Sequence, residues 1–249
     1  MSDPSRGIAC PPRINARGLV GIALACLAAV VLLAILVSTG LTRSVDVAII
    51  RLVRADALVE PLAVLRGVTT TGSTPWITAM ALLVLMAELL ARRPWLGIAA
   101  SATIGAASLV DTLAKNVVHR ARPDLLPPLE IEPGYSFPSG HATLSTVAYG
   151  IIALLLVHSR LPRMVKLLGV VALAVLVLLV GLSRVYLGVH YPSDVLGGWL
   201  TGAAIVLLFE ALVRSRLAPR VSREASTEPG EGAADGDRAA PRSDPPGPA

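Results

Sequence analysis

Residues 170–182, "VVALAVLVLLVGL", and residues 195–209, "VLGGWLTGAAIVLLF", enclose the polar stretch "SRVYLGVHYPSD" at residues 183–194. Neither apolar run contains a charged side chain. With its apolar flanks, each run approaches the ~20 residues that a helix needs to cross the hydrocarbon core of a bilayer. This part of the chain is therefore predicted to form two membrane-spanning helices joined by a polar loop. Solvation explains the polarity of such a loop, but not its arginine, histidine and aspartate.

Similar apolar blocks occur along most of the chain. The sequence is 54% hydrophobic and only 16% charged, which is more apolar than an ordinary soluble domain. Its apolar residues form long blocks rather than narrow stripes, which favours a bilayer over a soluble protein with several buried helices. The candidate spans are residues 19–37, 76–90, 95–114, 143–157, 165–182 and 195–213. We therefore expect an all-α integral membrane six-helix bundle, in which the second span is the shortest.

The connection between the first two blocks has a different character. Residues 44–72, "SVDVAIIRLVRADALVEPLAVLRGVTTTG", are half apolar, with arginines and carboxylates interspersed. This composition is typical of one or two amphipathic helices that lie at the membrane interface. A packed hairpin outside the membrane fits equally well, so both interpretations stay open.

The two ends of the chain are polar. Residues 1–17 are expected to form a cytoplasmic N-terminal tail, and residues 18–217 the six-span membrane domain. Residues 218–249, rich in Pro, Gly, Glu and Asp, are expected to form a disordered cytoplasmic tail, because they cannot bury a core. The first apolar block is longer than a signal-peptide core and has no clear cleavage site after it, so we expect it to remain as a span. Cys10 and Cys26 suggest neither a disulfide nor a metal site.

The basic residues predict the orientation. The net charge of +5 is divided among the ends of the apolar blocks, so nucleic acid is not an expected partner. In a six-span count, the basic segments at residues 1–17, 92–93 and 160–166 and after the last block share one side, which is the cytoplasmic side by the positive-inside rule. Arg122 and Arg184 are among several basic residues on the other side, a departure that an anion site there would partly explain. The arginine-rich composition is typical of a GC-rich bacterial genome. We therefore expect a multi-pass protein of the bacterial plasma (inner) membrane, with both termini cytoplasmic.

Three polar stretches on the predicted outer side contain chemically versatile residues. They are "KNVVHRARP" at 115–123, "YSFPSGHA" at 135–142 and the stretch at 183–194. Singly, each has a plainer interpretation: a charged anchor at a span end, a helix cap, or a structural pair four residues apart on one helix face. Together they supply the cations Lys115, Arg122 and Arg184, the bases His141 and His190, the carboxylate Asp194, and a small turn at Ser139–Gly140.

The order and spacing of these residues resemble the three motifs of the type 2 phosphatidic acid phosphatase family. The resemblance rests on Lys115 and Arg122-Pro123, then Pro138-Ser139-Gly140-His141, then Ser183-Arg184 with His190 and Asp194. It implies a phosphohistidine mechanism with His190, His141 and Asp194 in the catalytic roles. His190 would attack phosphorus, Asp194 would orient its imidazole, and His141 would protonate the leaving group and then activate water. The resemblance implies phosphate binding by Lys115, Arg122, Ser139, Gly140 and Arg184.

No cofactor and no metal are expected, because the family uses cations of the protein to neutralise the phosphate. The carboxylates near these stretches show no arrangement suited to magnesium: Asp111, Asp124, Glu130 and Glu132. His119 and Arg120 lie within the first stretch at positions that the motif does not specify. We expect both of these side chains to be solvated at the surface.

The expected function is hydrolysis of a lipid phosphate or diphosphate at the outer face of the membrane. Phosphatidate, phosphatidylglycerophosphate and undecaprenyl diphosphate are the substrate classes that the resemblance implies. The expected partners are this lipid substrate and the lipids of the bilayer, and the sequence predicts no oligomeric state. Two alternatives stay open: a lipid phosphotransferase with an alcohol as acceptor, and a non-enzymatic lipid-binding or transport protein that keeps the fold.

Overall fold

A computed structural model of the protein describes residues 15–54, 62–125 and 129–217, and all regular structure in these ranges is helical. The helices are α1 Ala16–Ser38, α2 Arg43–Arg54, α3 Leu62–Thr70, α4 Thr74–Leu90, α5 Pro94–Val118, α6 Gly140–His158, α7 Arg163–Tyr186 and α8 Pro192–Leu217. The expected all-α fold is confirmed. Cys26 is free, whereas Cys10 and the predicted C-terminal tail lie outside the described residues, as does nearly all of the N-terminal one.

Five of the described helices are individually long and apolar enough to cross a membrane, namely α1, α5, α6, α7 and α8. The predicted second span corresponds to α4, which has only 17 residues. Residues of α3 and α4 together pass the same test, but the two helices meet at a bend of 46° across a short break. The count of six spans therefore depends on treating α3 and α4 as one broken span.

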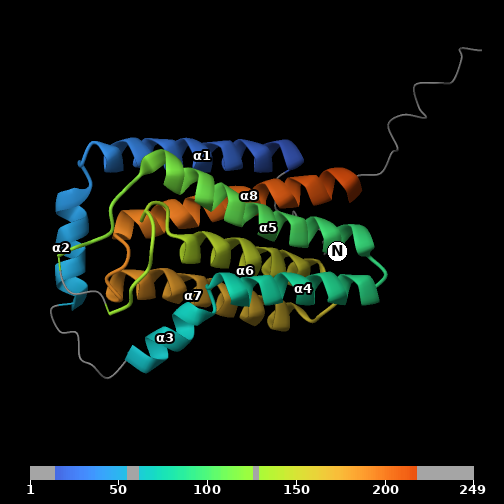
Figure 1. Ribbon diagram of the computed structural model, residues 1–249. Coiled ribbons are helices and arrows are strands. Elements are labelled where there is room, and N and C mark those ends of the chain that lie inside the picture. Colours follow the sequence, from blue (N-terminus) through green and yellow to red (C-terminus); the bar gives the residue numbers. More distant parts are fainter. Residues whose placement is uncertain (1–14, 55–61, 126–128, 218–249) are drawn as a thin grey trace, which may run out of the picture. The chain divides into compact units, whose positions relative to one another are not determined.

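Helices α4 to α8 run alongside one another, with α1 lying along the bundle near α5 and α8 (Figure 1). The core contains buried side chains from α4, α5, α6 and α8, among them Val147 and Ile151 of α6. Small residues let α6 and α8 approach closely, as is common in membrane bundles. A Cβ on Gly202 would lie 2.5 Å from the Cβ of Thr146, and one on Gly198 would lie 2.7 Å from the carbonyl oxygen of Ser139. The start of α6 is thereby held against α8.

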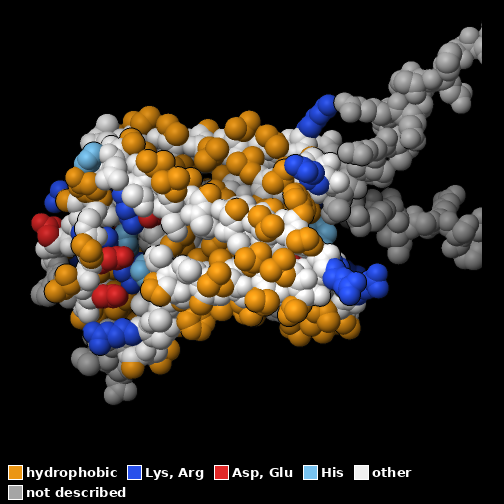
Figure 2. Space-filling view, turned by 45° about the vertical axis from the view of Figure 1, so that its right-hand side comes forward, with side chains coloured by type: hydrophobic (Ala, Val, Ile, Leu, Met, Phe, Trp, Pro, Cys, Tyr) orange, Lys and Arg blue, Asp and Glu red, His pale blue; other side chains and the backbone are white. Residues whose placement is uncertain are grey.

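The outer surface of the bundle is suited to lipid. Figure 2 shows hydrophobic side chains over the middle of the visible face, with charged side chains gathered at its two ends. Large apolar side chains on α1 and α7 are exposed, including Leu32, Leu168 and Val171. Exposed apolar surface of this extent requires a bilayer or another apolar partner.

The segment between α1 and α4 forms two short helices. Helix α2 lies across the ends of the longer helices (Figure 1), and it packs against α7, as does α3. Asp46 and Ile50 of α2 are buried, whereas Val45 and Leu52 are exposed, so the rest of the protein covers only part of the apolar surface of this helix. Asp56 and Glu60 lie outside the described residues.

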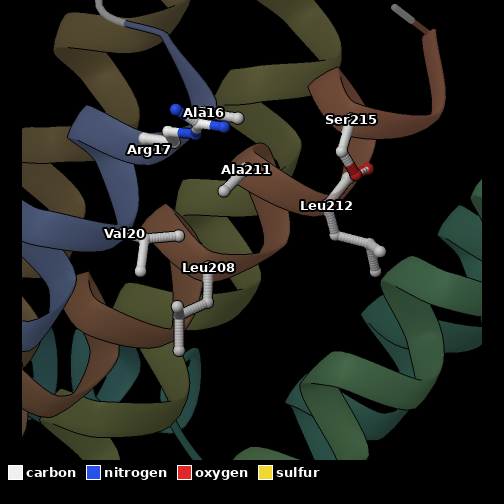
Figure 3. A pocket seen from close by; sticks show the side chains of 7 residues that line it. All are labelled: Ala16, Arg17, Val20, Leu208, Ala211, Leu212 and Ser215. Atoms are coloured by element: carbon white, nitrogen blue, oxygen red, sulfur yellow. Dashed lines mark hydrogen bonds between the residues drawn. The ribbon is translucent and has the colours of Figure 1, made fainter.

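An apolar groove of about 390 Å³ lies between the first turns of α1 and the last turns of α8 (Figure 3). Its lining includes Val20, Leu208 and Leu212. Along α8 the nearest of these residues is roughly 20 Å from Asp194, at a rise of ~1.5 Å per residue. This groove is therefore separate from the polar loops that carry the three motif stretches.

Candidate active site

The three motif stretches meet at one end of the bundle. Lys115 is in the last turn of α5, Gly140 begins α6, and Asp194 is in the first turn of α8. The Ser139 N–H donates to the Asp194 carbonyl at 3.0 Å, and the Ser136 N–H donates to the Arg120 carbonyl at 2.9 Å. These backbone bonds join residues that are 55 and 16 positions apart in the chain, and so bring the three stretches into one site.

His190 is completely buried in the turn that precedes α8, so it does not share a helix with Asp194. Its Nε2 lies 3.2 Å from Arg122 Nη1, and its Nδ1 lies 3.5 Å from Asp194 Oδ2. A guanidinium can only donate, so Nε2 accepts and the ring proton is placed on Nδ1, facing the carboxylate. Asp194 Oδ2 also accepts from the Tyr191 N–H at 2.8 Å, which holds the carboxylate in place.

Arg184 lies near the end of α7 and is also completely buried. Its Nη1 donates to Thr69 Oγ1 at 2.8 Å and to Glu130 Oε2 at 3.0 Å, and its Nη2 donates to Glu132 Oε2. Arg122 donates from Nη1 to the Val189 carbonyl at 2.9 Å and to Glu132 Oε2 at 3.1 Å. Both arginines therefore converge on one carboxylate.

Lys115 approaches the turn at the start of α6. Its Nζ lies 2.9 Å from Asp111 Oδ2 in an ion pair on α5. A Cβ on Gly140 would lie 3.1 Å from Lys115 Nζ and 3.0 Å from Asp111 Oδ2. Only a glycine at position 140 leaves these two side chains in place without displacement.

His141 and Ser139 complete the set of predicted residues. His141 Nδ1 lies 3.7 Å from Glu132 Oε1. Ser139 occupies the cap position of α6, but its hydroxyl makes no capping hydrogen bond. The plainer interpretation of this turn, in which Ser139 caps the helix through its side chain, is therefore not what the structure shows. The buried Ser139 Oγ and Arg184 Nε have no hydrogen-bond partner among the described residues, so both remain available to a ligand.

The expectation that Arg120 is solvated at the surface is wrong. Its side chain is only 11% exposed, and it pairs with Asp194 and, at 2.7 Å, with Asp46 of α2. Its guanidinium also lies 3.9 Å from the centre of the Tyr191 ring. His119 is exposed, as expected, and its ring meets that of Tyr135 edge-on. No local sequence pattern signals the carboxylate partners of Arg120, because both are 74 residues away.

Glu130 and Glu132 are two further residues that sequence reasoning left without a role. Both lie against Arg184, and Glu132 also contacts Arg122. Burial alone would raise the pKa of the Glu132 carboxyl, but its close contact with the His190 ring and the charge of Arg184 hold that pKa well below its usual range. In the described ranges, no three His, Cys, Asp or Glu side chains are grouped so that they could hold a metal ion.

Residues 95–217 match the PAP2 superfamily. Phosphatidylglycerophosphatase B of Bacillus subtilis is 34% identical over 182 residues, which cover 71% of this chain and 87% of that protein. Undecaprenyl-diphosphatase of Sulfolobus acidocaldarius is 36% identical over 138 residues, which cover 53% of this chain and 61% of that protein. The fold matches the crystal structure of a transmembrane PAP2 type phosphatidylglycerolphosphate phosphatase from Bacillus subtilis with a TM-score of 0.72 at 29% identity, over 80% of this chain and 98% of that one. The chain is therefore a multi-pass membrane protein that belongs to the PAP2 superfamily.

Proposed function

We propose that this protein hydrolyses a lipid phosphate or diphosphate through a phosphohistidine intermediate on His190. The observation that carries the proposal is the buried His190, which lies between Asp194 and Arg122 at the polar end of a membrane bundle. Phosphoryl transfer develops charge on the equatorial oxygens of phosphorus, so a cationic and pre-positioned site is what the reaction needs.

In the first step, the Nε2 lone pair of His190 attacks phosphorus, and the bond from phosphorus to the leaving oxygen breaks. Asp194, facing Nδ1–H, stabilises the positive imidazole that forms. His141, at the start of α6, gives its proton to the leaving oxygen as general acid. The products of this step are the dephosphorylated lipid and phosphohistidine.

In the second step, water attacks the phosphohistidine. His141 accepts the proton of this water as general base, the P–N bond breaks, and its electron pair returns to His190 Nε2. Orthophosphate is released and both histidines regain their starting states. An alcohol in place of water would give the phosphotransferase alternative with the same residues.

The cations replace a metal in this scheme. Arg122 and Arg184 are suited to bidentate contact with phosphate oxygens, and Lys115 adds a third positive charge. Ser139 Oγ and the backbone at Gly140 would add donors at the N-terminus of α6, where the helix dipole favours an anion. We therefore propose that activity requires neither a metal ion nor a cofactor.

The lipid chains of the substrate would lie in an apolar groove beside the site. A groove of about 310 Å³ opens between α2, α7 and α8, and its lining includes Ser183 and Val185, the neighbours of Arg184. Its other walls are apolar and include Ile49, Leu182 and Trp199. The names of the relatives point to phosphatidylglycerophosphate and undecaprenyl diphosphate as substrate classes to test first.

The site would face the outside of the bacterial plasma membrane. The N-terminal end of α1, the turn between α4 and α5 and the end of α8 carry basic residues on the side opposite the site, which the positive-inside rule assigns to the cytoplasm. A lipid headgroup at the outer interface would then present its phosphate to His190 while its chains remain in the bilayer.

The decisive test is phosphate release by the purified protein from phosphatidate, phosphatidylglycerophosphate and undecaprenyl diphosphate in the presence of EDTA. Release from at least one lipid is expected, with a trapped phosphoenzyme that His190→Ala abolishes. Asp194→Asn should still fold but lose kcat by orders of magnitude, because it disturbs the imidazole tautomer. A strict requirement for magnesium, or full activity of His190→Ala, would contradict the mechanism.

A further inference from the structure

The carboxylate of Glu132 lies where the phosphate is proposed to bind. Its Oε2 accepts from Arg122 Nη1 at 3.1 Å and from Arg184 Nη2, and it lies 3.5 Å from His190 Nε2. Its Oε1 lies 3.7 Å from His141 Nδ1. The two histidines and the two arginines of the proposed reaction thus surround a single carboxylate. Two guanidinium groups that share one carboxylate oxygen bind it much as they would bind a phosphate oxygen.

An anion at this place is electrostatically necessary when no substrate is bound. The guanidinium of Arg184 is fully buried, and a buried charge without a partner is strongly unfavourable. Lys115 already has Asp111 as its partner, and Glu130, whose side chain is 39% exposed, pairs with Arg184. Glu132 is the described carboxylate that reaches Arg122 and Arg184 together.

We propose that Glu132 is a resident competitor for the phosphate and thereby determines how tightly the site holds it. The carboxylate leaves the two arginines when the substrate's phosphate binds and returns to them as orthophosphate departs. Its negative charge and that of a phosphate cannot share one set of donors, because like charges at this distance repel strongly. This inference rests on the proposed function, since it places the phosphate at the same arginines.

The geometry permits this exchange without unfolding the loop. The Glu132 side chain is 24% exposed, so it can rotate toward water. The backbone beside it is held independently, because Arg122 donates to the carbonyls of Pro133 at 3.0 Å and Gly134 at 3.1 Å. A tetrahedral phosphate has more oxygens than a carboxylate and could also use the unpartnered Ser139 Oγ.

The size of the effect follows from how often Glu132 occupies the site. If the carboxylate is bound in about nine molecules of ten, the apparent Kd for phosphate rises about tenfold. Glu132→Gln removes the charge and keeps the shape of the side chain. It is therefore expected to bind orthovanadate and orthophosphate about tenfold more tightly.

Two readouts test this, and neither requires lipid turnover. One is the inhibition constant of orthovanadate with p-nitrophenyl phosphate as substrate. The other is the rise in Tm that orthophosphate causes, since a ligand that binds only the folded state stabilises it according to its Kd. Tighter binding by Glu132→Gln in both readouts supports the proposal, even if none of the tested lipids is hydrolysed and the proposed function fails.

Matched variants complete the design. Asp124→Asn removes the same charge from an exposed position in the same loop, and it should leave both readouts unchanged. Glu132→Asp shortens the side chain and should bind orthovanadate and orthophosphate with an affinity between those of the native protein and Glu132→Gln. This variant provides the test if Glu132→Gln does not fold. Unchanged or weaker phosphate binding in the folded Glu132 variants overturns the proposal, since Glu132 would then be a structural residue or a helper in phosphate binding.

Discussion

Arg120 donates through Nη1 to Asp194 Oδ1, so the carboxylate that faces His190 is paired with a guanidinium from the loop after α5. Through Nη2, Arg120 also donates to Asp46 Oδ2 at 2.7 Å. Asp46 in turn accepts from the Ser193 N–H at 3.0 Å and from Ser193 Oγ at 2.6 Å. A continuous chain of charged hydrogen bonds therefore connects helix α2 to the His190–Asp194 pair.

Breaking this chain should lower kcat with little change in KM, because none of its members is proposed to bind the substrate. Asp46→Asn keeps the shape but weakens the hold on Arg120, so the phosphoenzyme should form more slowly. Arg120→Ala leaves two buried carboxylates without their cation and should also destabilise the fold, by about 3–5 kcal/mol. Steady-state kinetics and thermal unfolding measure these effects, with Arg51→Gln on the exposed face of α2 as control. A pure KM effect in Asp46→Asn would argue against a positioning role.

His141→Ala should separate the two proposed steps. Removing the general acid should reduce turnover of a lipid substrate by roughly 10²- to 10⁴-fold, because its alkoxide is a poor leaving group. With p-nitrophenyl phosphate the leaving group needs less protonation, so the first step should survive and phosphohistidine should accumulate. Rapid-quench trapping of the phosphoenzyme is the measurement. Equal loss with both substrates and no trapped intermediate would instead make His141 a phosphate-binding residue.

Filling the groove beside the site should weaken the binding of lipid substrates and leave a substrate without a lipid chain unaffected. Leu182→Trp inserts a large side chain between α2 and α7 and should raise KM for a lipid phosphate by roughly tenfold, since each methylene that loses its contact costs about 0.8 kcal/mol. Activity on p-nitrophenyl phosphate, which has no chain, should be unchanged. Leu168→Trp places the same side chain on α7 outside this groove and is the control. An equal loss of both activities would place the lipid chains elsewhere.

The low pKa of the Glu132 carboxyl predicts a pH dependence of stability. The folded-state pKa lies below the ordinary value of 4.5, so the ionised group stabilises the fold above that pH and the stabilisation is lost as pH falls through the folded-state pKa. Without phosphate, the difference in Tm between the native protein and Glu132→Gln should stay constant from about pH 7 to about pH 5 and then narrow. Thermal unfolding of both proteins, from about pH 7 to below about pH 5, measures this difference in Tm. A difference that grows on acidification would contradict the assigned ion pairs.

The orientation of the protein can be tested with reporter fusions. A reporter after Arg216 should be cytoplasmic, and one after Asp124, in the loop that follows α5, should be external. Alkaline phosphatase and green fluorescent protein report the two sides. An external reporter after Arg216 would reverse the proposed topology and place the site in the cytoplasm.

The sequence by itself determined the membrane-spanning architecture and named the residues that the three motif stretches bring together. The architecture follows from a local property, the length of the apolar blocks, whereas the residues follow from the resemblance to a known family, and neither inference needs knowledge of distant contacts. The shortest block, 76–90, is the exception: α4 has 17 residues and passes as a span only together with α3, across a bend that no apolar count predicts.

Only the tertiary structure decided which groups Arg120, Asp46 and Glu132 contact. Arg120 and Glu132 lie in the loop between α5 and α6, which has no periodicity from which a partner could be read. Asp46 lies on α2, 147 residues before the Ser193 that it contacts. A charged side chain in such a segment resembles an ordinary solvated residue in the sequence. Its role appears only when folding removes it from water and brings opposite charges within reach, because a buried charge must be paired.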